Sequence, residues 1–368
     1  MVPAVEFTLD DDQQALQATV RAFLADQAPS AYVRSVIEHD HGITPDLWEH
    51  LAALGLTGLL VPAEHGGSGA GMVEAAVVLE EMGRLPLPGP YLSTAVLAAS
   101  AARRLGLVEL LPALADGTER GTVAIDEDGH GDVVDRIRTR ASRKSGRWRL
   151  SGAKSVVLDG AGASWVLVPA RTQEGIGTFL LRSPTVTAYP SLDVTRSLAR
   201  LDLHDEPAER VGPDGDHTAI WRRVVDDGAV ALCADALGSM EQAFDLAVEY
   251  AKVRVQFDRP IATFQATKHK AAEMLERIEL SRVGVHYAAW TSDVDHPARA
   301  EAAAMAKSFV VPAAVHVTGE AIQIHGGVGF TWACDAHLHY RRAKADDLLL
   351  GAAATWRHHV ADTYLATR

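Results

Sequence analysis

A proline that follows a long helical pattern is the feature of this sequence that most restricts its fold. The pattern is carried by apolar residues at helical spacing, Met240, Phe244, Ala247 and Ala251. It predicts one amphipathic helix from about residue 229 to about residue 254. Pro260 ends the pattern, because proline has no backbone N–H and disfavours helix at the preceding residue. We expect a turn at residues 258–260 and a second helix capped by Thr263, so that the two helices form a hairpin.

The expected hairpin gathers polar and aromatic groups at its corner. Arg254 and Phe257 lie at the end of the first helix, Gln265 begins the second, and His269 lies one turn beyond Gln265 on the same face. A guanidinium, an aromatic face and a carboxamide together suit an anion attached to a planar ring. The alternative is a solvated hairpin whose aromatic residues close the core, and the hairpin taken alone favours that alternative.

A glycine-rich turn changes this balance. Residues 323–331 read Gln-Ile-His-Gly-Gly-Val-Gly-Phe-Thr and close an alanine-rich helix with glycines that allow close backbone approach. Together with the hairpin, this turn resembles the acyl-CoA dehydrogenase family. The resemblance implies FAD as the cofactor, held by its pyrophosphate and adenosine and belonging to the neighbouring subunit. The residues that it assigns to FAD are Arg254, Phe257, Gln265, Gln323, Gly326 and Gly327.

The order of patterns along the chain predicts an α+β protein of three parts. Helical stripes fill residues 1–120, and Thr8 is expected to cap the first helix. Short β-branched and aromatic runs, among them 148–150 and 155–158, follow in residues 121–215. Residues 216–368 are helical again. The resemblance implies an N-terminal helical domain, a middle β-barrel or sandwich domain and a C-terminal four-helix bundle.

Composition excludes several functions. A net charge of −13 argues against nucleic acid or an anionic membrane as partner. The two cysteines, Cys233 and Cys334, have no disulfide or zinc spacing, and the histidines complete no metal site, so no metal is expected. No signal peptide and no uncharged apolar run of about 18 residues is visible, which favours the cytoplasm and no membrane span. Lys154 is interpreted as a surface lysine in a β-turn.

Other positions depart from the family. Val156 and Leu158 stand where the resemblance places a tryptophan and a threonine against the flavin ring, and neither can stack on a ring or hydrogen-bond to it. Leu350 occupies the usual position of the catalytic glutamate, and Gly228 occupies the position of the base in other members. A one-residue gap would make Asp227 the candidate base. Asp258 stands where the family usually has glycine.

Three hypotheses follow. The first is a subunit that completes the FAD site of a related catalytic subunit and contributes to α,β-desaturation of an acyl-CoA thioester. The second is a self-sufficient homo-oligomeric flavoenzyme with Asp227 as a displaced base. The third is a structural subunit without FAD. The resemblance implies an acyl-CoA substrate, a related subunit in a hetero-oligomer or a second copy in a homo-oligomer, and an electron-transfer flavoprotein or similar acceptor. It also implies that bulky thioesters, such as those with steroid side chains, are the substrates of paired subunits.

Overall fold

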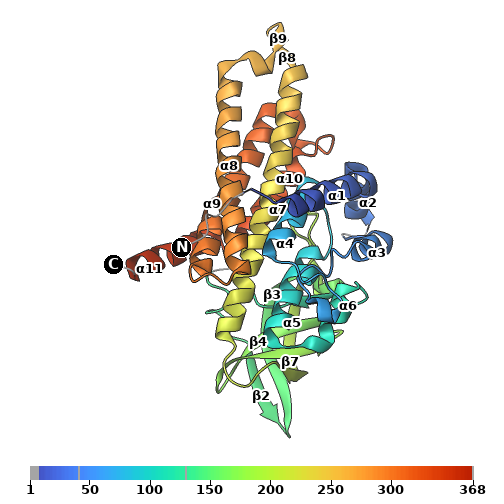
Figure 1. The fold of residues 1–368 in the computed structure, drawn as a ribbon, viewed down its shortest axis with the longest axis vertical. Helices are drawn as coiled ribbons and strands as arrows, with labels where there is room; N and C mark the ends of the chain where they lie inside the picture. The colour runs from blue at the N-terminus through green and yellow to red at the C-terminus, as the bar shows by residue number, and fades with distance from the viewer. Residues whose placement is uncertain (1–7, 40–41, 129–130, 367–368) are drawn as a thin grey trace.

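The N-terminal part of the chain is helical (Figure 1). The computed structural model describes residues 8–39, 42–128 and 131–366. Its first helices are α1 (Asp11–Gln27), α2 (Ser30–His39), α3 (Pro45–Ala53), α4 (Met72–Arg84), the π-helix η2 (Tyr91–Ala98), α5 (Ala99–Leu105) and α6 (Leu111–Ala115), with 3-10 turns η1 (Ala63–His65) and η3 (Val108–Leu110) between them. The prediction that Thr8 caps α1 is wrong. Asp10 is the cap, because its side chain accepts from the backbone N–H of Gln13 at 2.8 Å, and the Gln13 side chain accepts from the N–H of Asp10.

The middle part is a closed β-barrel. Its strands are β1 (Gly121–Val123), β2 (Arg140–Lys144), β3 (Arg147–Leu158), β4 (Trp165–Thr172), β5 (Gly175–Arg182), β6 (Thr187–Tyr189) and β7 (Leu198–Val211), with the 3-10 turn η4 (Gly160–Gly162) after β3. Strands β4, β2, β3, β7 and β5 pair in this order, and β5 pairs back with β4. The ring encloses an apolar core that includes Leu150, Val166 and Phe179. The runs 148–150 and 155–158, expected as separate strands, belong to the single strand β3, whose register against β7 shifts between them.

The C-terminal part is a helical bundle. It consists of α7 (Thr218–Val253), α8 (Gln265–Asp293), α9 (Arg299–His325), α10 (Ala336–Leu348) and α11 (Ala353–Ala366), with the small strands β8 (Val255–Gln256) and β9 (Arg259–Pro260) and the 3-10 turns η5 (Ile261–Thr263) and η6 (Gly326–Phe330). α7 begins earlier than expected because Trp221 anchors its first turn to the barrel, where its indole N–H donates to Thr178 at 2.9 Å. Thr263 does not cap α8. It lies in η5, its hydroxyl donates to the carbonyl of Pro260 at 2.7 Å, and Phe264 occupies the cap position.

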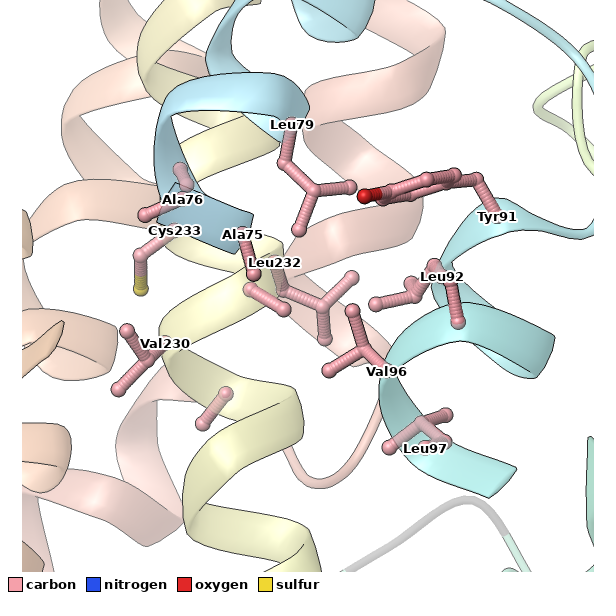
Figure 2. Close-up of a cluster of buried hydrophobic side chains, with 14 of the residues drawn as sticks. Ala75, Ala76, Leu79, Tyr91, Leu92, Val96, Leu97, Val230, Leu232 and Cys233 are labelled. Carbon is pink, nitrogen blue, oxygen red and sulfur yellow. The ribbon is translucent and has the colours of Figure 1, made fainter. Parts of the chain in front are cut away.

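The N-terminal helices and the bundle share one hydrophobic core. Figure 2 shows part of it, where Leu92 and Val96 of η2 face Leu232 of α7 and Tyr91 points toward Leu79 of α4. α4 crosses α7 at close range through Gly83 and Gly238, and a Cβ at either glycine would overlap a backbone carbonyl of the other helix. The expected boundaries near residues 120 and 215 fall in the connections between α6 and β1 and between β7 and α7. The division into domains stays a prediction.

One described segment, Arg299–Phe330, is long and apolar enough to cross a membrane by composition alone, with a mean hydropathy of 1.2. In the structure 61% of its most apolar window is buried against the rest of the molecule. Its apolar character is therefore explained by its place as a core helix of the bundle.

Candidate functional site

The hairpin of α7 and α8 projects from the bundle and ends in a tight turn (Figure 1). β8 and β9 pair across a two-residue loop, in which Phe257 has φ 52° and Asp258 has φ 61°. Two successive positive φ values define the turn that favours glycine, and aspartate is among the side chains that tolerate this conformation. This geometry explains why glycine suits the position of Asp258.

The side chains at this tip face outward. Phe257 is 87% exposed, and Arg254 and Gln265 are also exposed. Within the described part of the chain, no carboxylate lies within ion-pair distance of the Arg254 guanidinium. The guanidinium of Arg259 lies 4.2 Å from the centre of the Phe264 ring, and no ion pair between Arg259 and Asp258 is present among the described residues. Within the described residues, the tip thus presents the unpaired guanidinium of Arg254, the carboxamide of Gln265 and the aromatic ring of Phe257.

The glycine-rich turn lies at the same end of the bundle. His325, the last residue of α9, stacks on Tyr250 of α7 with 4.6 Å between ring centres, and Lys270 of α8 forms an ion pair with Glu320 of α9. Gly326 has φ 66°, and Gly326, Gly327 and Gln323 are exposed. The structure therefore brings the six residues assigned to FAD to one end of the bundle.

The two positions that the resemblance assigns to a catalytic base face each other. A Cβ built on Gly228 of α7 would lie 2.6 Å from Cδ1 of Leu350, which follows α10, and 2.5 Å from Cδ2 of Leu97 in η2. Leu350 has φ 58° and is 7% exposed, and Leu97 is 2% exposed. Leucine side chains therefore fill the place where either carboxylate would stand.

Asp227, the neighbour of Gly228, lies in a different environment. Its Oδ2 accepts from Nη2 of Arg104 at 2.7 Å and from the hydroxyl of Ser100 at 2.6 Å, and its Oδ1 accepts from Ser292 at 3.2 Å. The residue is 2% exposed. Successive residues on a helix point about 100° apart, so this carboxylate is directed away from the Gly228 position.

Other nearby carboxylates are also committed. Asp226 pairs with Arg299 at 3.2 Å, and burial raises its pKa to about 7. Asp346 of α10 pairs with Arg196 at 2.5 Å, and burial raises its pKa above the ordinary value. Asp347 accepts from the backbone N–H of Ala353 at 3.3 Å.

The barrel side of the site is apolar where the family places flavin contacts. Leu158 is 7% exposed and belongs to the same buried cluster as Leu97 and Leu350, and Val156 packs against this cluster. Val156 also forms a β-bridge with Asp126. These residues therefore offer no hydroxyl for a ring nitrogen and no aromatic face for a ring.

Lys154 is not a surface residue. It is fully buried inside the barrel, where its ammonium donates to Oε1 of Glu127 at 2.7 Å and to the carbonyl of Pro169 at 2.9 Å. Burial lowers the pKa of Lys154 to about 8, against the opposing effect of the Glu127 carboxylate. The ion pair fixes the segment around residue 127 to β3.

Comparison with known proteins agrees with this geometry. Residues 10–116 match the model "Acyl-CoA dehydrogenase, N-terminal domain" and residues 217–365 match "Acyl-CoA dehydrogenase, C-terminal domain". The chain is 32% identical over 348 residues to acyl-CoA dehydrogenase IpdE2 of Mycolicibacterium smegmatis, which covers 93% of this chain and 96% of the relative. These similarities define a class of FAD-binding oxidoreductases that act on CH–CH donors. The chain belongs to the acyl-CoA dehydrogenase family.

Two similar solved structures contain named pairs of chains. A variant of the Tcur3481–Tcur3483 steroid ACAD is 31% identical with a TM-score of 0.89, covering 98% of this chain and 99% of that chain. The ChsE4–ChsE5 complex from Mycobacterium tuberculosis is 27% identical with a TM-score of 0.89, again covering 98% and 99%. Both share the order of helices, β-rich domain and helices seen here.

The residues of this chain fit FAD only in part. The exposed tip and glycine turn offer a guanidinium, carboxamides and close backbone approach, which suit a pyrophosphate and an adenosine. The flavin-ring positions, by contrast, are occupied by Val156 and Leu158, and the base positions by leucine packing. The positions that the resemblance assigns to the flavin ring and to the base therefore carry only hydrocarbon in this chain.

Proposed function

We propose that this chain is one subunit of a hetero-oligomeric acyl-CoA dehydrogenase. It completes the FAD site of a related catalytic subunit and thereby contributes to α,β-desaturation of an acyl-CoA thioester. The observation that carries the proposal is the contact of Leu350 with the Gly228 position, because it leaves neither family position with a proton acceptor.

The chemistry explains why that contact matters. Desaturation next to a thioester needs a carboxylate that removes the α-proton in a site from which water is excluded. FAD, when bound, supplies the acceptor for the β-hydride. Here the two positions that meet across α7 and α10 carry only hydrocarbon. This chain's contribution is to bind: Arg254 would neutralise pyrophosphate charge, while Gln265 and Gln323 would donate to oxygens or ring nitrogens.

Asp227 is better explained as a structural ion pair than as a base. Arg104 and two hydroxyls saturate its oxygens, and it points away from the Leu350 contact. A carboxylate held in this way is poorly suited to accept a proton from a substrate, because the transfer would break charged hydrogen bonds in a buried site. The self-sufficient homo-oligomer with this base is therefore less well supported than the paired enzyme.

Relatives support a paired enzyme and a bulky substrate. The Tcur3481–Tcur3483 protein is described as a steroid ACAD, and ChsE4–ChsE5 as a complex of two chains. By analogy, the thioester of this enzyme carries a large acyl group such as a steroid side chain, and an electron-transfer flavoprotein or similar protein accepts its electrons. Cys233 and Cys334 are free thiols, which agrees with a reducing cytoplasm.

The test is the flavin spectrum of the purified protein, alone and after co-expression with a related acyl-CoA dehydrogenase chain from the same genome. We expect little flavin in the chain alone, and a yellow complex with dehydrogenase activity after co-expression. Arg254→Ala should lower the flavin content of that complex. Lys252→Ala removes a nearby cation that pairs with Glu249 at 2.6 Å, and it should leave the flavin content unchanged.

Two results would count against the proposal. A flavin-loaded and active homo-oligomer would favour Asp227 or another displaced base. An unchanged flavin content in the Arg254→Ala complex would favour a structural subunit that does not touch FAD.

A further inference from the structure

A run of cations interrupts an otherwise acidic chain. Residues 136–149 contain six arginines and one lysine and no aspartate or glutamate, although the whole chain has a net charge of −13. The rest of the chain therefore carries −20. Seven positive charges with no negative charge among them create a strong local positive potential on an otherwise acidic protein.

Residues 136–149, named here the basic hairpin, comprise a short segment before β2, β2 itself and the start of β3. Ser145 and Gly146, with φ 49° and 80°, form its two-residue turn. The hairpin lies at the end of the molecule opposite to β8 and β9 (Figure 1). In the strand register, Lys144 lies opposite Arg147 and Ser142 lies opposite Arg149. These side chains and that of Arg140 therefore share one face of the ribbon.

Several of these cations lack a carboxylate partner. Lys144 pairs with Asp205 at 2.5 Å, and Arg136 pairs with Asp128 at 2.9 Å. In the described part of the chain, no carboxylate lies within 4.0 Å of Arg140, Arg143 or Arg147. All three are exposed. The guanidinium of Arg143 also lies 5.6 Å from the centre of the Trp148 ring, so the charges of Arg140 and Arg147 are the ones available to a ligand.

The arrangement has an internal cost. Lys144 and Arg147 lie directly opposite each other, and like charges in that position destabilise a pair of strands. Charges on an exposed strand also prevent edge-to-edge aggregation, but lysine is the residue typical of that role, whereas this run has six arginines and one lysine. In a chain with 48 acidic and 35 basic residues, protection alone does not explain seven cations without one carboxylate.

We propose that the basic hairpin docks a carboxylate-rich surface of a partner protein. Arginine guanidinium groups bind carboxylates through two parallel hydrogen bonds, which suits a hairpin dominated by arginine. A long polyanion such as a nucleic acid or a lipid surface extends beyond the hairpin and meets the acidic remainder of the chain. A compact acidic patch can contact the hairpin alone. Dissolved salt screens its interaction with the more distant acidic residues of this chain, because the screening length is about 8 Å at physiological salt. The surface is separate from the tip proposed to hold FAD.

The test measures fluorescence anisotropy of a labelled peptide composed of glutamate and serine, titrated with the full-length protein at low and at physiological salt. We expect salt-sensitive binding that is weakened at least about threefold by Arg140→Gln combined with Arg147→Gln. The matched control is Arg277→Gln combined with Arg357→Gln, which removes the same charge elsewhere and should bind like the unmodified protein. The single variant Arg147→Gln, checked by circular dichroism, provides the measurement if the double variant fails to fold.

Three outcomes would overturn the proposal. The first is no peptide binding even at low salt. The second is an equal loss of binding in the hairpin variant and in the control variant, which indicates a response to net charge alone. The third is tighter hairpin-dependent binding to duplex DNA, or to vesicles of phosphatidylglycerol and phosphatidylcholine, than to the peptide, which indicates phosphate recognition.

Discussion

Nε2 of His359 on α11 lies 3.1 Å from Oδ2 of Asp132, which lies between β1 and β2. The hydrogen bond to Asp132 raises the pKa of His359 above its ordinary value. Although burial opposes it, the bonds from His359 and from the backbone of Asp135 lower the pKa of Asp132 to about 2. This contact attaches the last helix of the bundle to the segment that connects β1 with β2.

The pairing makes the attachment of α11 dependent on pH. Because the pKa of His359 is raised in the folded state, its contribution is full below the unfolded value of about 6.5 and is lost as the pH rises through the folded value. The contribution of Asp132 is present above about 4 and is lost as the pH falls toward 2. We expect the stability difference between the unmodified protein and His359→Gln to be below about 1 kcal/mol at pH 6, since the pair is partly exposed, and to shrink by pH 8.5. Thermal unfolding at both pH values measures it, and a difference that grows with pH would contradict the assignment.

Gly228→Ala should destabilise the protein by about 1 kcal/mol, because the new methyl group meets Leu97 and Leu350 in a packed core. Leu350→Ala in the same chain should relieve most of that cost. A double-mutant cycle by thermal unfolding measures the coupling, and independent effects of the two substitutions would show that the two positions do not meet.

Asp227→Asn should lower stability by roughly 2 kcal/mol, because it weakens charged hydrogen bonds with Arg104 in a buried site. Flavin content and turnover of the complex should persist below the unfolding temperature. If the two residues act as a pair, Arg104→Gln should cost less when it is combined with Asp227→Asn than when it is made alone. Complete loss of turnover with an intact flavin spectrum would instead identify this carboxylate as the base.

Asp258→Gly should stabilise the tip by about 0.5–1 kcal/mol, because glycine adopts a φ of 61° without steric cost. It should also increase flavin retention in the complex by removing a negative charge near the pyrophosphate site. Asp258→Asn removes the charge and keeps a side chain that tolerates this conformation, so it separates the two effects. Equal flavin retention in all three proteins would show that the tip does not contact the cofactor.

Local patterns were sufficient for the hairpin and the glycine turn. Pro260 ends a helical pattern, and the glycines after His325 end another, so both features depend on residues adjacent in sequence. The family resemblance also correctly implied the barrel and the bundle. These features place the nucleotide-binding candidates without any knowledge of packing.

Features that depend on distant contacts could not be predicted in this way. The burial of Lys154 depends on Glu127, which lies 27 positions earlier, and nothing in the local β-turn pattern signals that partner. The meeting of Gly228 with Leu350 needs the docking of α10 against α7. Thr263 was expected to cap α8, but its hydroxyl has a nearer acceptor in the carbonyl of Pro260.

The unbroken length of α7 fixes the distance between the Gly228 position and Arg254 at the hairpin. Between Gly228 and Arg254 the helix rises roughly 39 Å at 1.5 Å per residue, with no proline in its interior. A coenzyme held at Arg254 is therefore separated by most of the length of this helix from the Gly228 position of the same polypeptide. Under the proposed function, the length of this one helix places cofactor binding and catalysis on different chains.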